Sequence, residues 1–135
     1  MLKTLEIKTR NQGHSAPAPA PTRAQGVIAR LRETRRDNEI SQEDLARLIG
    51  ASWPSVSRWE RGKARPEEDS LVRMERLLLL EQKIKPALRP GTFKRFLFTP
   101  HPLLDNFAPV DLLQSGYSFQ RLLALVEGML SGDMA

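Results

Sequence analysis

The chain has 135 residues, with 21 Lys and Arg against 16 Asp and Glu, a net charge of +5 and a pI near 10.1. This length accommodates one domain or two small ones, and the basic balance favours a polyanionic partner. The absence of cysteine excludes disulfides, thiolate zinc sites and a cysteine nucleophile. The longest apolar run, Leu122–Val126, is far shorter than the roughly 18 residues that a membrane span needs. We therefore expect a soluble, cytoplasmic protein.

Charge and composition divide the chain into three segments. Residues 1–23 carry four basic groups against one acidic group and contain an alternating Ala-Pro run, which cannot form a helix because proline lacks a backbone donor. We expect a disordered tail there. Residues 24–85 hold 13 basic and 11 acidic groups, and residues 86–135 hold four of each. Both of these segments place apolar residues at helical spacing, which predicts an all-α fold.

The middle segment reads as a run of short helices. The first covers about residues 24–36 and ends at a break in which Asn38 is expected to be left-handed. Ser41 opens the second helix, with Asp44 placed to complete a capping box. Gly50 is a natural stop for that helix.

The next two helices also have residues that favour helix starts and ends at their expected boundaries. Ser52 caps the third helix, Pro54 sits in its first turn and Gly62 ends it. The fourth begins near Pro66, where acidic residues suit the positive end of the helix dipole. We expect four to five short helices in this domain.

Two helices separated by only Gly50, Ala51 and Ser52 form a helix-turn-helix signature. The strings ISQEDLARLIG (residues 40–50) and ASWPSVSRWERGK (residues 51–63) resemble the XRE family, the Cro and phage-repressor type, and the resemblance extends over residues 27–80. It implies a DNA-binding domain. Two departures are Glu39, where the family often has Gly, and Trp53-Pro54, where it usually has polar residues.

The resemblance implies that the third helix is the recognition helix, with its N-terminal residues toward base edges in the major groove. Arg58 is the best candidate for a bidentate contact to guanine, with a phosphate contact or a solvated charge as the alternative. A basic cluster follows this helix, and we expect it to bind phosphates rather than remain a solvated loop. The predicted DNA-binding residues are Gln42, Ser52, Trp53, Ser55, Ser57, Arg58, Arg61, Lys63 and Arg65.

Three of these positions carry specific expectations. Trp53 either packs on a thymine methyl or sugar, or folds back onto the domain. Trp59 lies three residues after Val56 and is expected in the core. The resemblance implies that Gln42 contacts a phosphate and braces the recognition helix, with a plain surface glutamine as the alternative.

Residues 77–80 are four consecutive leucines, more than one buried helix face requires. The excess apolar side predicts packing against either a second protomer or the C-terminal segment. A two-fold homodimer would read two DNA half-sites about 34 Å apart, or a multiple of that distance.

The C-terminal segment, residues 86–135, reads as a small helical domain. A short aromatic helix is expected over residues 92–98 and another over residues 108–113. Gly116 is expected to end the latter and Ser118 to cap a final helix. About 50 residues are too few to form a stable hydrophobic core of their own, so we expect this segment to pack against the first domain or against a partner.

Four strings in this segment resemble the toxin-binding domain of Xre/MbcA/ParS-type antitoxins. They are FKRFL (93–97), PHPLL (100–104), PVDLL (109–113) and LLALVEGML (122–130). The resemblance implies a RES-type toxin partner that destroys NAD, and an inhibitory element after Tyr117. A dimerisation or packing helix is the alternative. The predicted partner-binding residues are Tyr117, Phe119, Leu122, Val126, Met129, Leu130 and Met134.

These observations predict an all-helical, nucleoid-associated repressor that binds operator DNA, neutralises a RES-type toxin and regulates its own operon. A stand-alone dimeric XRE regulator and an adaptor that no longer binds DNA are the alternatives. The sequence pairs no nucleophile with a base, and its two histidines, His14 and His101, lie far apart. We therefore expect no enzyme activity, no cofactor and no metal.

Overall fold

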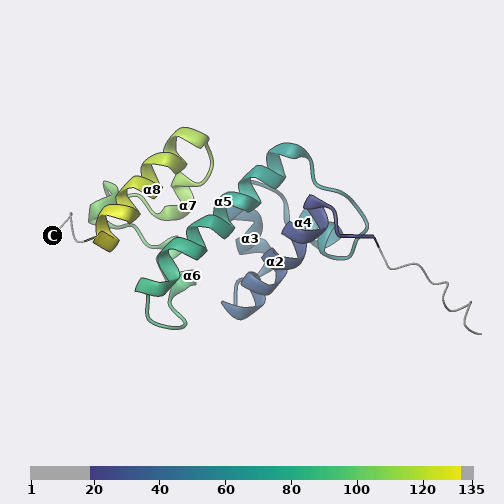
Figure 1. Ribbon diagram of the computed structural model, residues 1–135, viewed down its shortest axis with the longest axis horizontal. Helices are drawn as coiled ribbons and strands as arrows, with labels where there is room; N and C mark the ends of the chain where they lie inside the picture. The colour runs from purple at the N-terminus through teal and green to yellow at the C-terminus, as the bar shows by residue number, and fades with distance from the viewer. Residues whose placement is uncertain (1–18, 132–135) are drawn as a thin grey trace, which may run out of the picture.

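The computed structural model describes residues 19–131, and this part of the chain contains seven α-helices and no strands, which confirms the all-α prediction (Figure 1). An isolated bridge joins His101 to Phe107. None of the described helices has the length and apolar character that a bilayer crossing requires. Residues 16–18 of the Ala-Pro run lie outside the described residues, and residues 19–21 precede α2 without helical structure. The elements are α2 (Arg23–Asp37), α3 (Gln42–Ile49), α4 (Trp53–Glu60), α5 (Glu68–Ile84), η1 (Lys85–Ala87), α6 (Phe93–Phe98), η2 (Pro102–Leu104), α7 (Pro109–Leu112) and α8 (Gly116–Ser131).

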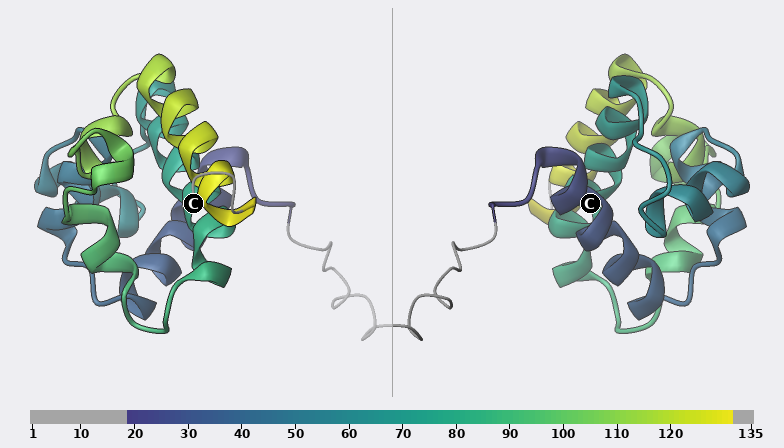
Figure 2. Two further views of the ribbon diagram at one scale, coloured as in Figure 1. Left: turned by 90° about the vertical axis from the view of Figure 1, so that its left-hand side faces the viewer. Right: turned by 90° about the vertical axis from the view of Figure 1, so that its right-hand side faces the viewer.

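The long helix α5 joins the two parts of the chain. It contacts α2 and α3 from the N-terminal part and α8 from the C-terminal part. Figure 2 shows α8 lying alongside α5 in both end-on views. Among the leucines of residues 77–80, Leu77 and Leu80 are fully buried and only Leu79 is exposed. The C-terminal segment therefore covers apolar surface of α5 within the same chain, one of the two arrangements expected for this leucine run.

The break between α2 and α3 differs from the expectation in one residue. Glu39, with a φ of 55°, is left-handed, whereas Asn38 has a φ of −108°. The buried Asn38 side chain instead donates to the Thr34 carbonyl at 2.7 Å, so it caps α2 and leaves the turn to the next residue. A left-handed Glu39 also explains why glycine suits this position in XRE-type sequences.

The helix caps of the middle segment follow the expected chemistry. Ser41 Oγ accepts a hydrogen bond from the Asp44 amide at 2.9 Å, and Ser52 Oγ accepts one from the Ser55 amide at 3.3 Å. Only half of the predicted capping box forms, because the Asp44 carboxylate lies 3.4 Å from Lys94 Nζ instead. This ion pair joins the start of α3 to α6.

The start of α8 corrects the sequence prediction. Gly116 is the first residue of α8 rather than the end of α7. The helix is capped by Ser115, whose Oγ accepts from the Ser118 amide at 3.1 Å. Ser118 lies inside the first turn, where its hydroxyl donates to the Leu112 carbonyl at 3.1 Å. A glycine can begin a helix when the residue before it supplies the cap.

Two left-handed glycines provide a matched pair for a stability test. Gly50 has a φ of 64° and Gly62 a φ of 71°, but a Cβ at Gly50 would lie 2.7 Å from Gln114 Oε1, whereas a Cβ at Gly62 would meet nothing within 4 Å. Gly62→Ala should cost about 1 kcal/mol from backbone strain. Gly50→Ala should cost about 2 kcal/mol, because Gln114 must also give up its hydrogen bonds.

Chemical denaturation of both variants measures the difference. In a Gln114→Ala background, the cost of Gly50→Ala should fall to that of Gly62→Ala. Equal costs for the two single variants would contradict a close contact between Gln114 and the turn.

Candidate nucleic-acid interface

The outer face of α4 presents most of the predicted DNA-binding residues together. Ser52, Trp53 and Arg58 are exposed, and Ser55 is partly exposed, while Val56 on the opposite face is buried. Trp53 is 50% exposed, so it is not buried against the domain and a large part of its surface is accessible to solvent. Because α4 is only eight residues long, these side chains form one compact surface at its N-terminal end.

A row of hydrogen bonds runs along this face. Ser52 Oγ donates to Ser55 Oγ at 2.9 Å, and Arg58 Nη2 donates to the same oxygen at 3.3 Å. The guanidinium of Arg58 is thereby held over the first turn of the helix. Its remaining donors are available for the planar, bidentate pairing that a guanine edge offers.

Basic side chains continue the surface beyond α4. Arg61, Lys63 and Arg65 are exposed, and Arg61 Nε donates to the Ser57 carbonyl at 3.4 Å. Within residues 19–131, neither these three residues nor Arg58 has a carboxylate oxygen within 4.0 Å. Their charges are therefore not neutralised by this part of the chain, as a phosphate-binding surface requires.

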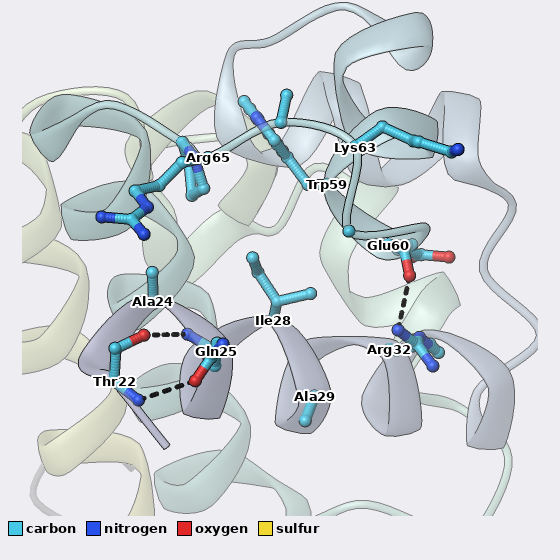
Figure 3. A pocket seen from close by; sticks show the side chains of 13 residues that line it. Thr22, Ala24, Gln25, Ile28, Ala29, Arg32, Trp59, Glu60, Lys63 and Arg65 are labelled. Carbon is cyan, nitrogen blue, oxygen red and sulfur yellow. Dashed lines mark hydrogen bonds between the residues drawn. The ribbon is translucent and has the colours of Figure 1, made fainter. Parts of the chain in front are cut away.

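The basic loop also forms one wall of an open pocket of about 500 Å³. Figure 3 shows Lys63 and Arg65 on the loop side, with Ile28 of α2 and its N-cap residue Thr22 opposite them. Trp59 lines the same pocket and is partly buried rather than enclosed in the core as expected, although it packs against the core. The pocket leaves both basic side chains accessible from solvent.

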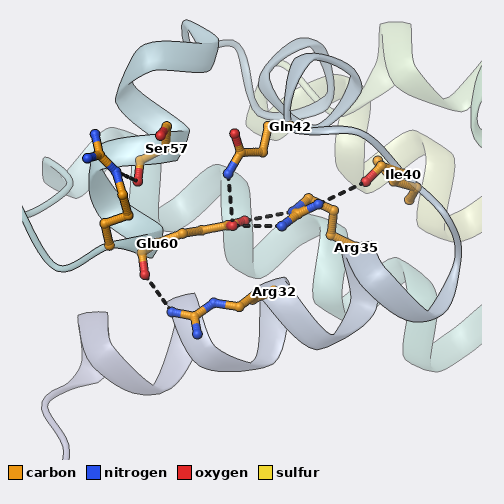
Figure 4. Close-up of polar contacts among 7 residues, drawn as sticks. Arg32, Arg35, Ile40, Gln42, Ser57 and Glu60 are labelled. Carbon is orange, nitrogen blue, oxygen red and sulfur yellow. Dashed lines mark hydrogen bonds and ion pairs between the residues drawn. The ribbon is translucent and has the colours of Figure 1, made fainter.

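A polar network on the inner side of α4 fixes this helix to its neighbours. The Glu60 carboxylate accepts two hydrogen bonds from Arg35, at 2.7 and 2.8 Å, and one from Gln42 at 3.1 Å. Arg32 Nη2 donates to the Glu60 carbonyl at 2.6 Å (Figure 4). Gln42 therefore contacts α4 through Glu60, whereas its roles in bracing a recognition helix and binding a phosphate stay predictions. Glu60 thus ties α4 to both α2 and α3.

The electrostatic state of Glu60 follows from this network. Burial acts to raise the pKa of Glu60, but the hydrogen bonds from Arg35 and Gln42 and the positive charges of Arg35 and Arg32 outweigh it. The pKa of Glu60 consequently lies below its ordinary value, and the ion pair is present at neutral pH. The sequence did not predict this role of Glu60. A single acidic residue within the basic stretch of residues 58–65 nevertheless indicates an ion pair with a basic residue elsewhere in the domain.

The C-terminal site needs a correction. Phe119, Leu122 and Val126 are buried in the hydrophobic core of this chain, so in this structure they hold α8 in place and do not face a partner. Tyr117 and Leu130 are 84% and 45% exposed, and Met129 is partly exposed. The remaining predicted residue, Met134, lies outside the described residues. Of the predicted partner-binding residues that the structure describes, only Tyr117, Met129 and Leu130 are therefore accessible to a partner.

Two further apolar side chains beside α8 were not predicted. Leu103 and Phe107 are exposed, on the loop that contains η2. Within this loop, η2 packs against α8, and Asp105 forms an ion pair with Arg121 of α8. Within the described residues, no three His, Cys, Asp or Glu side chains group in a way that could hold a metal ion. Leu103 and Phe107 therefore add exposed apolar surface beside α8.

Comparison with known proteins shows similarity to a helix-turn-helix family and to mycobacterial antitoxins. A helix-turn-helix family model matches residues 31–80. The mycobacterial cidal antitoxin MbcA of Mycobacterium tuberculosis is 29% identical over 93 residues, which cover 69% of this chain and 81% of MbcA, and its Mycobacterium bovis counterpart matches equally. A probable mycobacterial cidal antitoxin of M. tuberculosis is 36% identical over 75 residues, covering 55% of this chain and 63% of that protein.

A solved structure extends the likeness to three dimensions. A chain of the crystal structure of the M. tuberculosis MbcT–MbcA toxin–antitoxin complex superposes with a TM-score of 0.66 and 25% identity, covering 78% of this chain and 95% of that one. Both resemblances inferred from the sequence are confirmed. Residues 31–80 form an XRE-type helix-turn-helix, and the chain is homologous to the MbcA antitoxin.

Proposed function

We propose that this chain, an XRE-type helix-turn-helix protein homologous to MbcA, is the DNA-binding antitoxin of a type II toxin–antitoxin pair. It neutralises a RES-type toxin that degrades NAD, and it represses its own operon. The observation that carries this proposal is the likeness to a chain of a toxin–antitoxin complex over 78% of the molecule. That share is larger than residues 1–85 could supply, so the likeness includes part of the C-terminal segment.

The N-terminal part supplies DNA recognition in this proposal. The N-terminal end of α4 enters the major groove, with Arg58 reading a guanine and Ser52, Trp53, Ser55 and Ser57 making the neighbouring contacts. Gln42 and the basic residues Arg61, Lys63 and Arg65 bind phosphates and fix the register. Few base edges lie within reach of one eight-residue helix, so the operator is bound by a homodimer at two half-sites.

The C-terminal part, residues 86–135, supplies the toxin contact. Tyr117 is the strongest anchor, because an aromatic side chain that is 84% exposed contributes little to folding and gains most from burial in an interface. Leu130 and Met129 extend the apolar surface along α8. The whole segment after Tyr117, down to Met134 and Ala135, is the inhibitory element implied by the antitoxin resemblance.

Tyr117→Ala tests this surface without disturbing the core. Removing residues 117–135 as a block would also remove Phe119, Leu122 and Val126, so a truncated chain would lose both its fold and its partner. In Tyr117→Ala, by contrast, the affinity for the toxin should fall by at least about 30-fold, the usual effect of losing a central aromatic anchor. Gln120→Ala, an exposed change in the same turn of α8, is the matched control.

The measurement is affinity purification of each full-length tagged variant from its native cell, followed by identification and quantification of the partner. We expect a RES-type protein in fixed stoichiometry with the parent chain and Gln120→Ala, and little of it with Tyr117→Ala. Recovery of the chain alone, still able to bind operator DNA, would contradict the antitoxin function and leave a stand-alone dimeric regulator.

A further inference from the structure

The C-terminal part of the chain forms hydrogen bonds to the end of α3, next to the turn of the helix-turn-helix. Gln114, just after α7, donates from Nε2 to the carbonyls of Arg47 and Leu48, each at 3.2 Å, and to the Val110 carbonyl at 3.2 Å. The first two carbonyls belong to the last turn of α3. A side chain that is 67 residues away from Arg47 in sequence therefore closes the end of α3, directly before the turn that leads to α4.

The last carbonyls of a helix lack partners within the helix itself. In α3, the Ala46 and Arg47 carbonyls accept from the amides of Gly50 and Ala51, which form the turn. The Leu48 carbonyl depends on Gln114. The Gln114 side chain also lies close to the turn, since a Cβ on Gly50 would lie 2.7 Å from Gln114 Oε1.

Two further contacts hold the same helix from the C-terminal part. Lys94 of α6 lies 3.4 Å from Asp44 in the first turn of α3, and the Arg47 guanidinium lies over the Phe98 ring at 4.8 Å from its centroid. Both ends of α3 are therefore anchored to the C-terminal part, through α6 and through Gln114. Within residues 19–131, the hydrogen bonds that α4 receives from other elements come from Arg32, Arg35 and Gln42, and none of these residues belongs to the C-terminal part.

We propose that Gln114 is a positioning residue for operator binding, which orients α4 through the turn of residues 50–52. This inference rests on the DNA-binding part of the proposed function. Base contacts depend on the angle at which α4 enters the groove, whereas phosphate contacts from the flexible side chains of the basic loop tolerate small rotations. Loss of Gln114 therefore weakens binding to the operator and leaves binding to unrelated DNA nearly unchanged.

Gln114→Met in the full-length chain tests this role, because methionine keeps the length of the side chain and removes its donor. The ratio of affinities for the tightest duplex selected from a random pool and for a scrambled duplex should fall about fivefold, the effect of losing one to two hydrogen bonds. Arg76→Met is the matched control. It removes a hydrogen bond of 3.2 Å from α5 to the Leu113 carbonyl and a cation–π contact with the Phe119 ring, and within the described residues Arg76 makes no hydrogen bond to α3 or α4.

A ratio in Gln114→Met equal to that of the parent, with only a lower melting temperature, would overturn the positioning role, because partial unfolding lowers both affinities equally. An equal loss of the ratio in Arg76→Met would also overturn it. A parent chain without any sequence preference would overturn the DNA-binding function together with this role. That result is distinguishable from failure of the Gln114 inference alone, in which the parent still discriminates.

Discussion

Arg58→Ala should abolish most of the discrimination between operator and unrelated DNA. The guanidinium is exposed on the outer face of α4, held by Ser55 Oγ at 3.3 Å, and within the described residues has no carboxylate partner. A bidentate contact to guanine contributes about 1–3 kcal/mol of discrimination per half-site. A dimer that reads two half-sites should therefore lose at least about 30-fold in selectivity. Binding isotherms on a selected duplex and on a scrambled duplex of the same composition measure this ratio.

Lys63→Ala is the control for this experiment. Its charge lies in the loop after α4, so we expect similar weakening on both duplexes and a smaller dependence of affinity on salt. Discrimination by Arg58→Ala equal to that of the parent would rule out a base contact by this side chain and assign it to a phosphate or to solvent.

Glu60→Ala should be the most destabilising of the substitutions considered. The Glu60 and Arg35 side chains are 10% and 15% exposed, so removing the carboxylate leaves the Arg35 charge largely buried and unpaired. Breaking such a pair costs about 3 kcal/mol, which corresponds to a fall in melting temperature of about 10 °C or more for a domain of this size. Glu68→Ala is the matched control, because its ion pair with Arg23 is well exposed and screened by solvent, so its loss should lower the melting temperature much less.

The same carboxylate predicts how stability depends on pH. The pKa of Glu60 is lowered in the folded state, so its contribution is complete above the ordinary value of 4.5 and is lost as the pH falls through the folded-state pKa. Melting temperatures between pH 3 and pH 7 should decline less steeply on the acid side in Glu60→Gln than in the parent. Identical acid slopes would contradict an ionised Glu60 in the native network.

The parts of the fold that depend on local chemistry could be predicted from the sequence. Ser41 and Ser52 are the N-cap residues of α3 and α4, and Gly50 is the left-handed residue that ends α3. Each of these roles depends only on residues within one helix turn. The misplaced boundaries involve neighbouring residues with similar capping ability. Asn38 and Glu39 can each close the end of α2, and Ser115 and Ser118 can each begin α8, so tertiary packing decides between them.

The parts of the site that depend on distant residues could not be predicted. Glu60 and Arg35 are 25 residues apart, and no spacing rule brings them together. The apolar stripe of α8 is a clear signal for burial, but periodicity does not reveal whether the covering surface is a partner or α5 of the same chain. Phe119, Leu122 and Val126 were assigned to a partner for this reason.

The most direct test of the antitoxin function is the rate of NAD consumption by the purified toxin partner, measured with increasing amounts of this full-length chain. We predict that the rate falls to background near a fixed stoichiometric ratio, and that Tyr117→Ala requires a much higher concentration than Gln120→Ala. An unchanged rate of NAD loss at saturating amounts of the chain would contradict the proposed neutralisation.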